Sequence, residues 1–365
     1  MEERLARLIA GRQGAFRAAE ARTAGYSSEE VRARLASGRW LALRRGVYVD
    51  SHLAERAVHD EVRWHLLVAE GVAAAASERL TFSHGTAVRF HGLAHLRDTG
   101  SQVHITRAKR TDIHGLIANG IDLHVAGLPS HHVMPTPLFD VTTPARTVAD
   151  MARYSSPRNA IVIGCHALVR RLTTRRAVDQ VVRTMTRWPG VRKARVVTEL
   201  LDARAETAIE SLALAIWHEQ GLPHPHLQVW AYDSHGFIGI VDGAWIDRGT
   251  VYETDGLVKY RELGGDMLTR EKLRQERLEQ AGLQVRRLTW SELWNGGQLI
   301  AVRLKRAFDR AAVSPRPRVR LYVGHPDRSR PVHISPVDET SLTQLGFELA
   351  YDGLSTPVGL GKWAG

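Results

Sequence analysis

Acidic side chains gather around the end of one predicted strand in the second half of the chain. The stretch Val251-Tyr252-Glu253-Thr254-Asp255-Gly256 carries two acids, while Asp242 lies on the preceding apolar strand and Glu210 on the helix before that. Mg²⁺ and Mn²⁺ prefer oxygen ligands, and such an ion neutralises developing phosphate charge and makes a bound water nucleophilic. The spacing therefore predicts a metal site formed by Asp242, Glu253 and Asp255, and it indicates phosphodiester chemistry.

The elements that would position these acids follow one another over about a hundred residues. Glu206 to Glu219 is an amphipathic helix that carries Glu210. The turn sequence Asp233-Ser234-His235-Gly236 lies between two apolar segments, which predicts a hairpin with Asp242 on its second strand. The other predicted elements are a strand at 250–253, a charged helix at 266–281, a strand at 284–288 and a helix at 291–310. This order predicts an α/β core with a mixed sheet over residues 201–310.

Each acid also has an interpretation without chemistry. Asp255-Gly256 is a common turn dipeptide, and for Asp255 taken alone a structural role is favoured. Asp242 lies on a strand that is expected to be half-buried, where an unpaired carboxylate would be costly. Metal binding is therefore favoured for Asp242 and Glu253, whereas both interpretations stay open for Glu210.

The charge balance indicates a polyanionic partner. The chain has 365 residues, a formal net charge of +11 and a pI near 10.2, and its length predicts two or three domains. From Arg158 to Arg195 there are ten Lys or Arg residues and one acid, Asp179. Such a span is either a solvated helix face or a phosphate-binding surface, and the scarcity of interleaved acids favours the second.

Residues 1–50 predict a winged helix-turn-helix that binds double-stranded DNA. Short helices at 2–10 and 16–23 precede a third helix, which opens with Ser27 and Glu30 at capping positions. A hairpin follows, with a basic tip. The third helix would enter the major groove and the hairpin would lie on the backbone. The arginines expected to contact DNA are Arg32, Arg34, Arg39, Arg44 and Arg45. The alternative is a three-helix packing module whose arginines are solvated.

The compartment is predicted from three features. Cys165 is the only cysteine, which excludes an internal disulfide and fits a reducing cytosol. The start of the chain carries acids and lacks a long apolar segment, so it does not resemble a secretory signal. No apolar run approaches the roughly 20 residues that span a bilayer. We expect a soluble, cytoplasmic protein.

Residues 51–200 predict an α+β middle domain with basic helices. A long alanine-rich helix at 59–76 precedes a helix at 86–93 and short alternating segments at 103–106, 121–125 and 132–134, which indicate a small sheet. Thr143 and Pro144 then open another helix, as N-cap and first helical residue.

The N-terminal half resembles AbiEi-type antitoxins of type IV toxin-antitoxin systems. Besides the winged helix, the resemblance rests on the segments 83–88 (SHGTAV), 90–93 (FHGL), 103–106 (VHIT) and 142–150 (TTPARTVAD). It covers about residues 1–200. It implies DNA binding, autoregulation and a cognate nucleotidyltransferase toxin.

Residues 201–310 resemble the PD-(D/E)xK nuclease superfamily, in the branch allied to very-short-patch-repair endonucleases. The supporting segments are 208–211 (AIES), 221–223 (GLP), 241–242 (VD) and 252–256 (YETDG), with Glu271, Lys272 and Arg274 further along. The resemblance implies a restriction-endonuclease-like fold and metal-dependent hydrolysis of DNA. Asp242 matches the first acid of the superfamily pattern, Glu253 the second, and Glu210 the helical glutamate.

One catalytic position departs from that pattern. Asp255 occupies the place of the usual lysine, which would stabilise the attacking hydroxide or the phosphate charge. Lys259 or Lys272 would have to supply the ammonium group from another position, and Lys259 is favoured because it lies nearer the carboxylates in sequence. Gly243 also stands where the family has a bulky residue, and a glycine weakens a strand.

Two classes of function remain after this comparison. In the first, the protein binds DNA and hydrolyses its phosphodiesters with Glu210, Asp242, Glu253, Asp255 and Lys259. In the second, the protein is a non-enzymatic antitoxin and transcriptional repressor, and its nuclease fold is inactive. Residues 311–365 form a tail rich in proline, glycine and arginine, which is expected to be disordered in part.

A zinc site at His91 and His95 is disfavoured. The two histidines have an i, i+4 spacing, but no glutamate directly follows His91 and no cysteine pair is nearby. A packed or solvated pair of histidines is the favoured interpretation.

Overall fold

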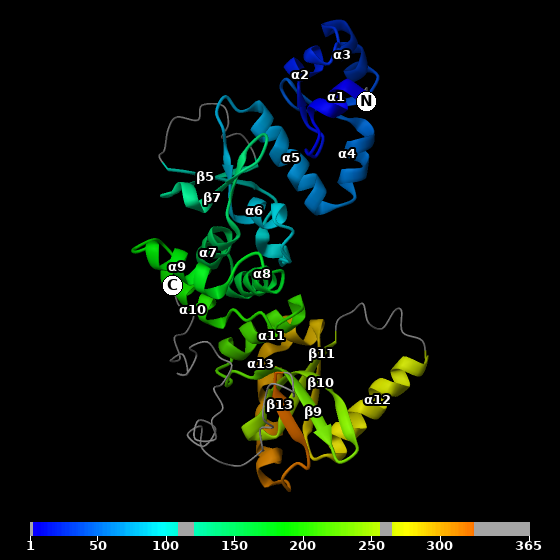
Figure 1. Cartoon of the computed structure of the whole chain (residues 1–365), viewed down its shortest axis with the longest axis vertical. Coiled ribbons are helices and arrows are strands. Elements are labelled where there is room, and N and C mark those ends of the chain that lie inside the picture. The colour runs from blue at the N-terminus through cyan, green and yellow to red at the C-terminus, as the bar shows by residue number, and fades with distance from the viewer. Residues whose placement is uncertain (1–2, 109–119, 256–264, 325–365) are drawn as a thin grey trace. The chain divides into compact units, whose positions relative to one another are not determined.

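The computed structural model describes residues 3–108, 120–255 and 265–324, and the chain divides into two compact units (Figure 1). Unit 1 comprises residues 1–155 and 172–191, and unit 2 comprises residues 156–171 and 192–365. The division does not follow the boundary expected near residue 200, because α8 (Pro157–Val169) packs along α11 (Ala208–Glu219) in unit 2.

The first part of unit 1 holds three short helices and a small antiparallel sheet. The helices are α1 (Glu3–Leu8), α2 (Ala18–Thr23) and α3 (Ser28–Ala36), and the sheet order is β1-β3-β2. Its strands are β1 (Phe16–Arg17), β2 (Trp40–Arg44) and β3 (Val47–Asp50). The prediction that Phe16 begins a helix was wrong. Phe16 pairs with Tyr48 and packs its ring 4.7 Å from that of Trp40, so burial fixes it in a strand.

The helix expected at residues 59–76 is α5 (Glu61–Ala75), and a further helix that was not expected, α4 (Ser51–Val58), precedes it. Asp60 separates them because its Oδ1 accepts hydrogen bonds from the backbone N–H groups of Val62 (3.0 Å) and Arg63 (3.1 Å), which caps α5.

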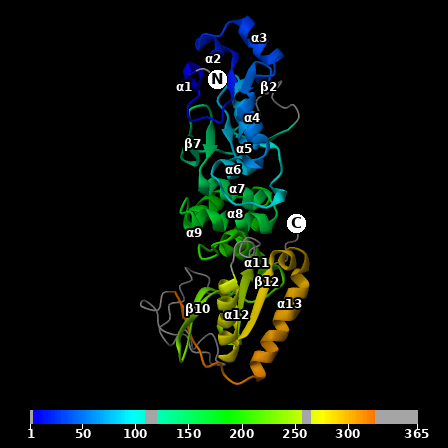
Figure 2. The ribbon, with the colours of Figure 1, turned by 90° about the vertical axis from the view of Figure 1, so that its right-hand side faces the viewer.

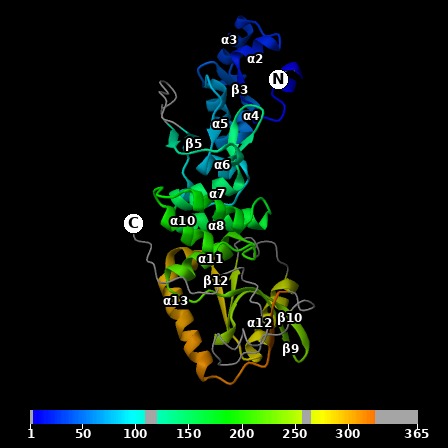
Figure 3. The ribbon, with the colours of Figure 1, turned by 60° about the vertical axis from the view of Figure 1, so that its left-hand side comes forward.

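A second, mixed sheet completes unit 1, with the order β6-β5-β4-β8-β7. The strands β5 and β6 run parallel, as do β4 and β8, and the other two pairings are antiparallel. The helices α6 and α7 lie beside this sheet (Figure 3), and α9 packs on α7. The strands are β4 (Thr81–Phe82), β5 (Val103–Arg107), β6 (Ile121–Val125), β7 (Val133–Pro135) and β8 (Asp140–Thr142). The helices are α6 (His84–Phe90), α7 (Pro144–Tyr154) and α9 (Arg175–Thr184), and α7 has the predicted Thr143 N-cap.

Unit 2 is built on a five-stranded mixed sheet with the order β12-β11-β10-β9-β13. β11 and β12 run parallel and the other pairs are antiparallel, so the prediction of a mixed sheet is confirmed. The strands are β9 (His226–Asp233), β10 (Gly236–Trp245), β11 (Thr250–Asp255), β12 (Gln284–Thr289) and β13 (Arg320–Val323). The remaining helices are α10 (Val191–Leu200), α12 (Gly265–Gln280) and α13 (Trp290–Val313). β13 belongs to the segment expected as a tail, because its apolar residues pair with β9 and Leu321 is fully buried.

Helices cover this sheet through two sets of contacts (Figure 2). Leu278 and Ala281, on α12 and just after it, join an apolar cluster with strand residues such as Val251. On α11, Trp217 packs its ring 5.6 Å from Trp245, which in turn lies 5.2 Å from Phe308 of α13. The helices are thereby packed against the sheet, and β10 and β11 carry the predicted acids.

Among the described residues, no helix combines the length and the apolar character needed to cross a bilayer.

Candidate functional site

Asp242 is fixed on β10 by the neighbouring strand. Its Oδ2 atom accepts two hydrogen bonds from Thr254 of β11, one from the backbone N–H and one from Oγ1, each 2.7 Å long. β10 and β11 are antiparallel, and the register Gly243↔Tyr252 brings these segments together. The costly unpaired carboxylate considered from the sequence is therefore avoided by a local pair of hydrogen bonds.

Glu210 lies in the first turn of α11 and faces the same group of acids. Its carboxylate accepts hydrogen bonds from Thr207 Oγ1 (2.6 Å), the Glu206 backbone N–H (2.9 Å) and Gln228 Nε2 (3.1 Å). Burial raises the pKa of Glu210, and the negative charge of Asp242 raises it further. Gln228 on β9 is thus a direct neighbour of Glu210 in the structure.

Glu253 on β11 is buried and is held by two arginines. Arg274 of α12 binds it in a bidentate way, with Nη1–Oε1 at 2.6 Å and Nη2–Oε2 at 2.9 Å, and Arg287 Nη2 lies 3.3 Å from Oε2. Glu271 joins the same network through Arg274 (2.9 Å) and Arg287 (2.6 Å). Burial raises the pKa of Glu253, while the two guanidinium groups oppose that shift and Asp242 adds to it.

Arg274 and Arg287 place positive charge beside Glu253. Arg287 could have been located from strand pairing, because the parallel register of β11 and β12 sets it opposite Glu253. Lys259 lies outside the described residues. Asp255, at the end of β11, is half-buried and pairs in register with Thr289.

Glu210 and Glu253 each lie within electrostatic range of Asp242. Their oxygens suit Mg²⁺ or Mn²⁺ in donor type. In the arrangement seen here, however, Glu253 is occupied by arginine. Over residues 3–108, 120–255 and 270–324, a three-residue group with ligand atoms within 4.8 Å of one another occurs elsewhere, at His104, Asp122 and His124.

The structure explains why position 243 is a glycine. A Cβ atom at this position would lie 2.2 Å from Cε1 of Tyr252, the residue opposite it on β11. The glycine therefore lets the Tyr252 ring lie against the β10 backbone, where it joins Trp217 and Trp245 in the aromatic cluster (ring centroids 5.5 and 5.2 Å).

The predicted DNA-binding arginines lie on α3, between α3 and β2, and on the β2–β3 hairpin of unit 1. Arg32, Arg39 and Arg45 are exposed. Arg44 is half-buried at the end of β2, and Gly46, with φ +74°, forms the turn beside it. Arg34 differs, because its guanidinium carbon lies over the rings of Tyr26 (4.8 Å) and Trp40 (5.3 Å). This cation–π stacking commits Arg34 to the core of the module and leaves the other four arginines as the basic surface.

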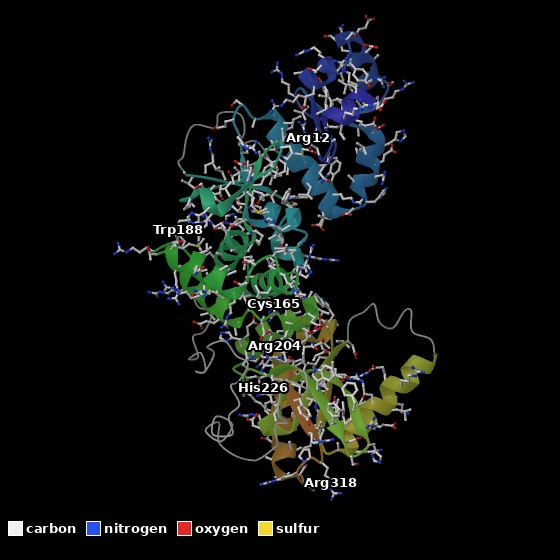
Figure 4. The ribbon with its side chains drawn as sticks, in the orientation of Figure 1. Arg12, Cys165, Trp188, Arg204, His226 and Arg318 are labelled. Carbon is white, nitrogen blue, oxygen red and sulfur yellow. The ribbon has the colours of Figure 1, made fainter. Side chains whose placement is uncertain are left out.

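The basic span 158–195 is divided between the two units, so it is not one continuous element. In unit 2, Arg158 binds Glu219 (Nη2–Oε2 2.6 Å), and in unit 1, Arg183 binds Asp179 (2.6 Å). Trp188, labelled in Figure 4, lies under the guanidinium of Arg153 at 4.8 Å. Several of these cations thus have partners that the sequence did not reveal.

His91 and His95 do not face a common ligand. His91 Nε2 donates a hydrogen bond to the Thr142 carbonyl (2.8 Å), and His95 Nδ1 donates to the Leu93 carbonyl (2.9 Å). This agrees with the favoured interpretation of a packed pair.

Residues 3–49 match a protein-family model described as a transcriptional regulator, AbiEi antitoxin. The matched segment is the first part of unit 1, with its three helices and small sheet. The AbiEi resemblance is therefore confirmed for the N-terminal module. For the middle region and for the nuclease-like region, the resemblance stays a prediction.

Relatives occur in Mycobacterium tuberculosis. An uncharacterized protein of strain CDC 1551 and one of strain H37Rv are each 28% identical to this chain over 173 residues. The aligned part is 47% of this chain and 63% of each relative, so the chain spans less than two thirds of their length.

Proposed function

We propose that the protein is a cytoplasmic DNA-binding transcriptional regulator of the AbiEi antitoxin class, with residues 3–50 acting as a winged helix-turn-helix. The observation that carries this proposal is the family match to residues 3–49, which coincides with the module that exposes arginines on α3 and on the following hairpin.

In this proposal α3 enters the major groove and the β2–β3 hairpin lies on the phosphate backbone. Arg32 follows the capped start of α3, and Arg45 lies at the tip of the hairpin. Both side chains are exposed. Arg39 is exposed between the helix and β2. The stacked Arg34 stabilises the module and contributes less to contact with DNA.

The proposal is tested by a gel-shift titration with a duplex from the promoter of the protein's own gene. The double variant Arg44→Ala/Arg45→Ala is expected to bind more weakly and to lower the salt dependence, by a slope of about 0.9 for each lost phosphate contact. Arg306→Ala, an exposed arginine on α13 of unit 2, serves as the matched control. Equal binding by the double variant and the control would refute the interface.

The antitoxin role further requires a toxin, and a nucleotidyltransferase encoded beside this gene is the expected partner. Co-expression tests this point: the full-length protein should relieve growth arrest by that enzyme. If the protein binds DNA but does not relieve the growth arrest, the antitoxin role is refuted and the role of transcriptional regulator remains.

A second candidate function is hydrolysis of DNA phosphodiesters in unit 2. The convergence of Glu210, Asp242 and Glu253 favours it, and a bound Mg²⁺ or Mn²⁺ would supply a nucleophilic water. Asp242, Glu253 and Asp255 would hold the ion, once Glu253 is released from Arg274. Glu210 would orient the water with its carboxylate, which the protein holds in place by hydrogen bonds.

A plasmid-nicking assay with Mg²⁺ or Mn²⁺ tests this second candidate. Nicking by the wild type that is lost in Asp242→Ala and kept in Asp309→Ala, an exposed acid on α13, would support hydrolysis at this site. Absence of nicking, or equal nicking by Asp242→Ala, would exclude it and leave unit 2 without a catalytic role.

A further inference from the structure

Three side chains with metal-ligand chemistry lie together on two parallel strands of unit 1. In the register of β5 and β6, His104 stands opposite Asp122, and His124 follows Asp122 by two residues. Because side chains alternate between the faces of a strand, Asp122 and His124 project from the same face. No motif in the sequence marks this group, since its members come from two separate strands.

The distances within the group match the edges of a metal tetrahedron. His104 Nδ1 lies 3.0 Å from His124 Nε2 and 3.5 Å from Asp122 Oδ2, and His124 Nε2 lies 3.7 Å from the same oxygen. With ligand bonds of about 2.0–2.2 Å, neighbouring ligands of a tetrahedral zinc ion are about 3.3 Å apart. The three atoms therefore form a triangle of the right size around a single ion.

The surroundings hold these ligands in position. The His84 ring stacks on His124 with centroids 3.6 Å apart, and the Tyr154 hydroxyl donates a hydrogen bond of 2.8 Å to Asp122 Oδ2. Such outer contacts commonly orient metal ligands.

The site is sheltered but accessible from solvent. The His104 side chain is 2% exposed, that of His124 16% and that of Asp122 31%. An ion can thus enter past Asp122, while His104 anchors it at the buried end. The alternative is that no ion binds and that the same contacts are a hydrogen-bonded histidine pair beside a carboxylate. The test must distinguish this alternative from a metal site.

We propose that His104, Asp122 and His124 bind one divalent transition-metal ion of the zinc class in tetrahedral geometry. Two imidazoles and one carboxylate suit zinc or cobalt, in contrast to the oxygen-only acids of unit 2. The ion links β5 to β6, the strand at the end of the sheet order, and so stabilises this sheet. With three protein ligands in the described part of the chain, a tetrahedral ion has a fourth position for water.

The test uses tag-free, full-length protein that has been stripped with a chelator and titrated with Co²⁺. The titration is carried out in the Asp242→Ala variant, so that the acids of unit 2 do not add a second Co²⁺ ion to the stoichiometry. We expect one Co²⁺ per chain, with the intense visible absorption of a tetrahedral site, and displacement of Co²⁺ by Zn²⁺. Asp122→Asn and His124→Asn should each weaken binding at least about tenfold, because the first replaces an anionic ligand with a weaker neutral amide and the second removes an imidazole ligand.

The matched control is His131→Asn, which replaces an exposed histidine of the same unit. It should bind Co²⁺ like the parent. Zn²⁺ should also raise the melting temperature of the parent and of His131→Asn, but not that of Asp122→Asn, because an ion that binds only the folded state stabilises it.

Absence of stoichiometric Co²⁺ binding would overturn the proposal. So would an unchanged absorption spectrum and affinity in Asp122→Asn and His124→Asn. The circular dichroism of each variant is compared with that of the parent to check that it folds. If His124→Asn fails to fold, the result with Asp122→Asn is used, because the amide oxygen of Asn at position 122 can still accept the Tyr154 hydrogen bond.

Discussion

Asp242 and Thr254 are joined across two antiparallel strands by a pair of hydrogen bonds, both of 2.7 Å and both to Asp242 Oδ2. This relationship sets the direction of the carboxylate that matches the first acid of the superfamily pattern. It also links β10 to β11 beside the buried Glu253, so the acid group is part of the structural framework of unit 2.

Replacing Thr254 by valine should lower the free energy of unfolding by about 1–2 kcal/mol. The substitution keeps the side-chain shape and removes one hydrogen bond to a charged acceptor. Thr254→Ser retains the hydroxyl and is the control. Urea unfolding followed by tryptophan fluorescence gives the measurement, and a Thr254→Val protein as stable as the serine variant would contradict the role of this contact.

Replacing Arg274 by methionine should destabilise unit 2 by about 3 kcal/mol, because it leaves the buried Glu253 without its bidentate partner. The matched variant Arg270→Met changes an exposed arginine on the same helix and should cost little. Chemical denaturation of both proteins makes the comparison. The double variant Arg274→Met/Glu253→Gln should recover part of the loss, and a further loss would argue against the pairing.

Glu70 on α5 should make the stability of the folded protein depend on pH, with a sign that follows from its raised pKa. Burial raises its pKa to about 7, although its Oε2 accepts a hydrogen bond from the Ala15 backbone N–H (3.3 Å). Between pH 4.5 and 7 the folded state keeps a proton that the unfolded state has released, so the stability contributed by Glu70 falls as the pH rises through this window.

Glu70→Gln isolates this effect from the other carboxylates. The stability of the variant relative to wild type should increase by about 3 kcal/mol from pH 4.5 to pH 7, and it should change little above that range. Parallel denaturation series at several pH values measure the difference. A difference that does not vary with pH would show that Glu70 titrates normally.

Ser27→Ala should shorten α3 at its start. Ser27 Oγ accepts a hydrogen bond from the Glu30 N–H (3.1 Å), and the Glu30 carboxylate accepts one from the Ser27 N–H (2.7 Å). Loss of this N-cap is expected to cost about 1 kcal/mol and to weaken promoter binding, because Arg32 directly follows the frayed turn. Ser28→Ala, one residue later and exposed, is the control, and hydrogen exchange of α3 reports the fraying. Equal protection in both variants would contradict the capping role.

Gly243→Ala should disrupt the β10–β11 contact, because the added methyl group would overlap the Tyr252 ring. Overpacking of this kind costs about 1–3 kcal/mol. Gly236→Ala provides a contrast, since its Cβ would meet no atom within 4 Å and only its φ of +108° is unfavourable. Near-ultraviolet circular dichroism should change in Gly243→Ala and stay close to wild type in Gly236→Ala. An unchanged spectrum in Gly243→Ala would contradict the tight contact.

The elements that the sequence predicted well are those with local signals. The capping positions Ser27 and Thr143, the turn at 233–236 and the alternating strands of unit 2 depend on residues within a few positions of one another. The same local logic failed at Phe16, where packing against Trp40 overrode the helical pattern. It also left out β13, whose pairing with β9 joins residues far apart in the chain.

The sequence alone thus determined which acids, arginines and histidines the protein has, and which helices and strands carry most of them. The tertiary structure alone decided their partners: Arg274 and Arg287 for Glu253, Tyr26 and Trp40 for Arg34, and the grouping of His104, Asp122 and His124. The physical reason is that strand register and helix packing bring together side chains that are distant in sequence, and burial then fixes which charges and lone pairs face one another.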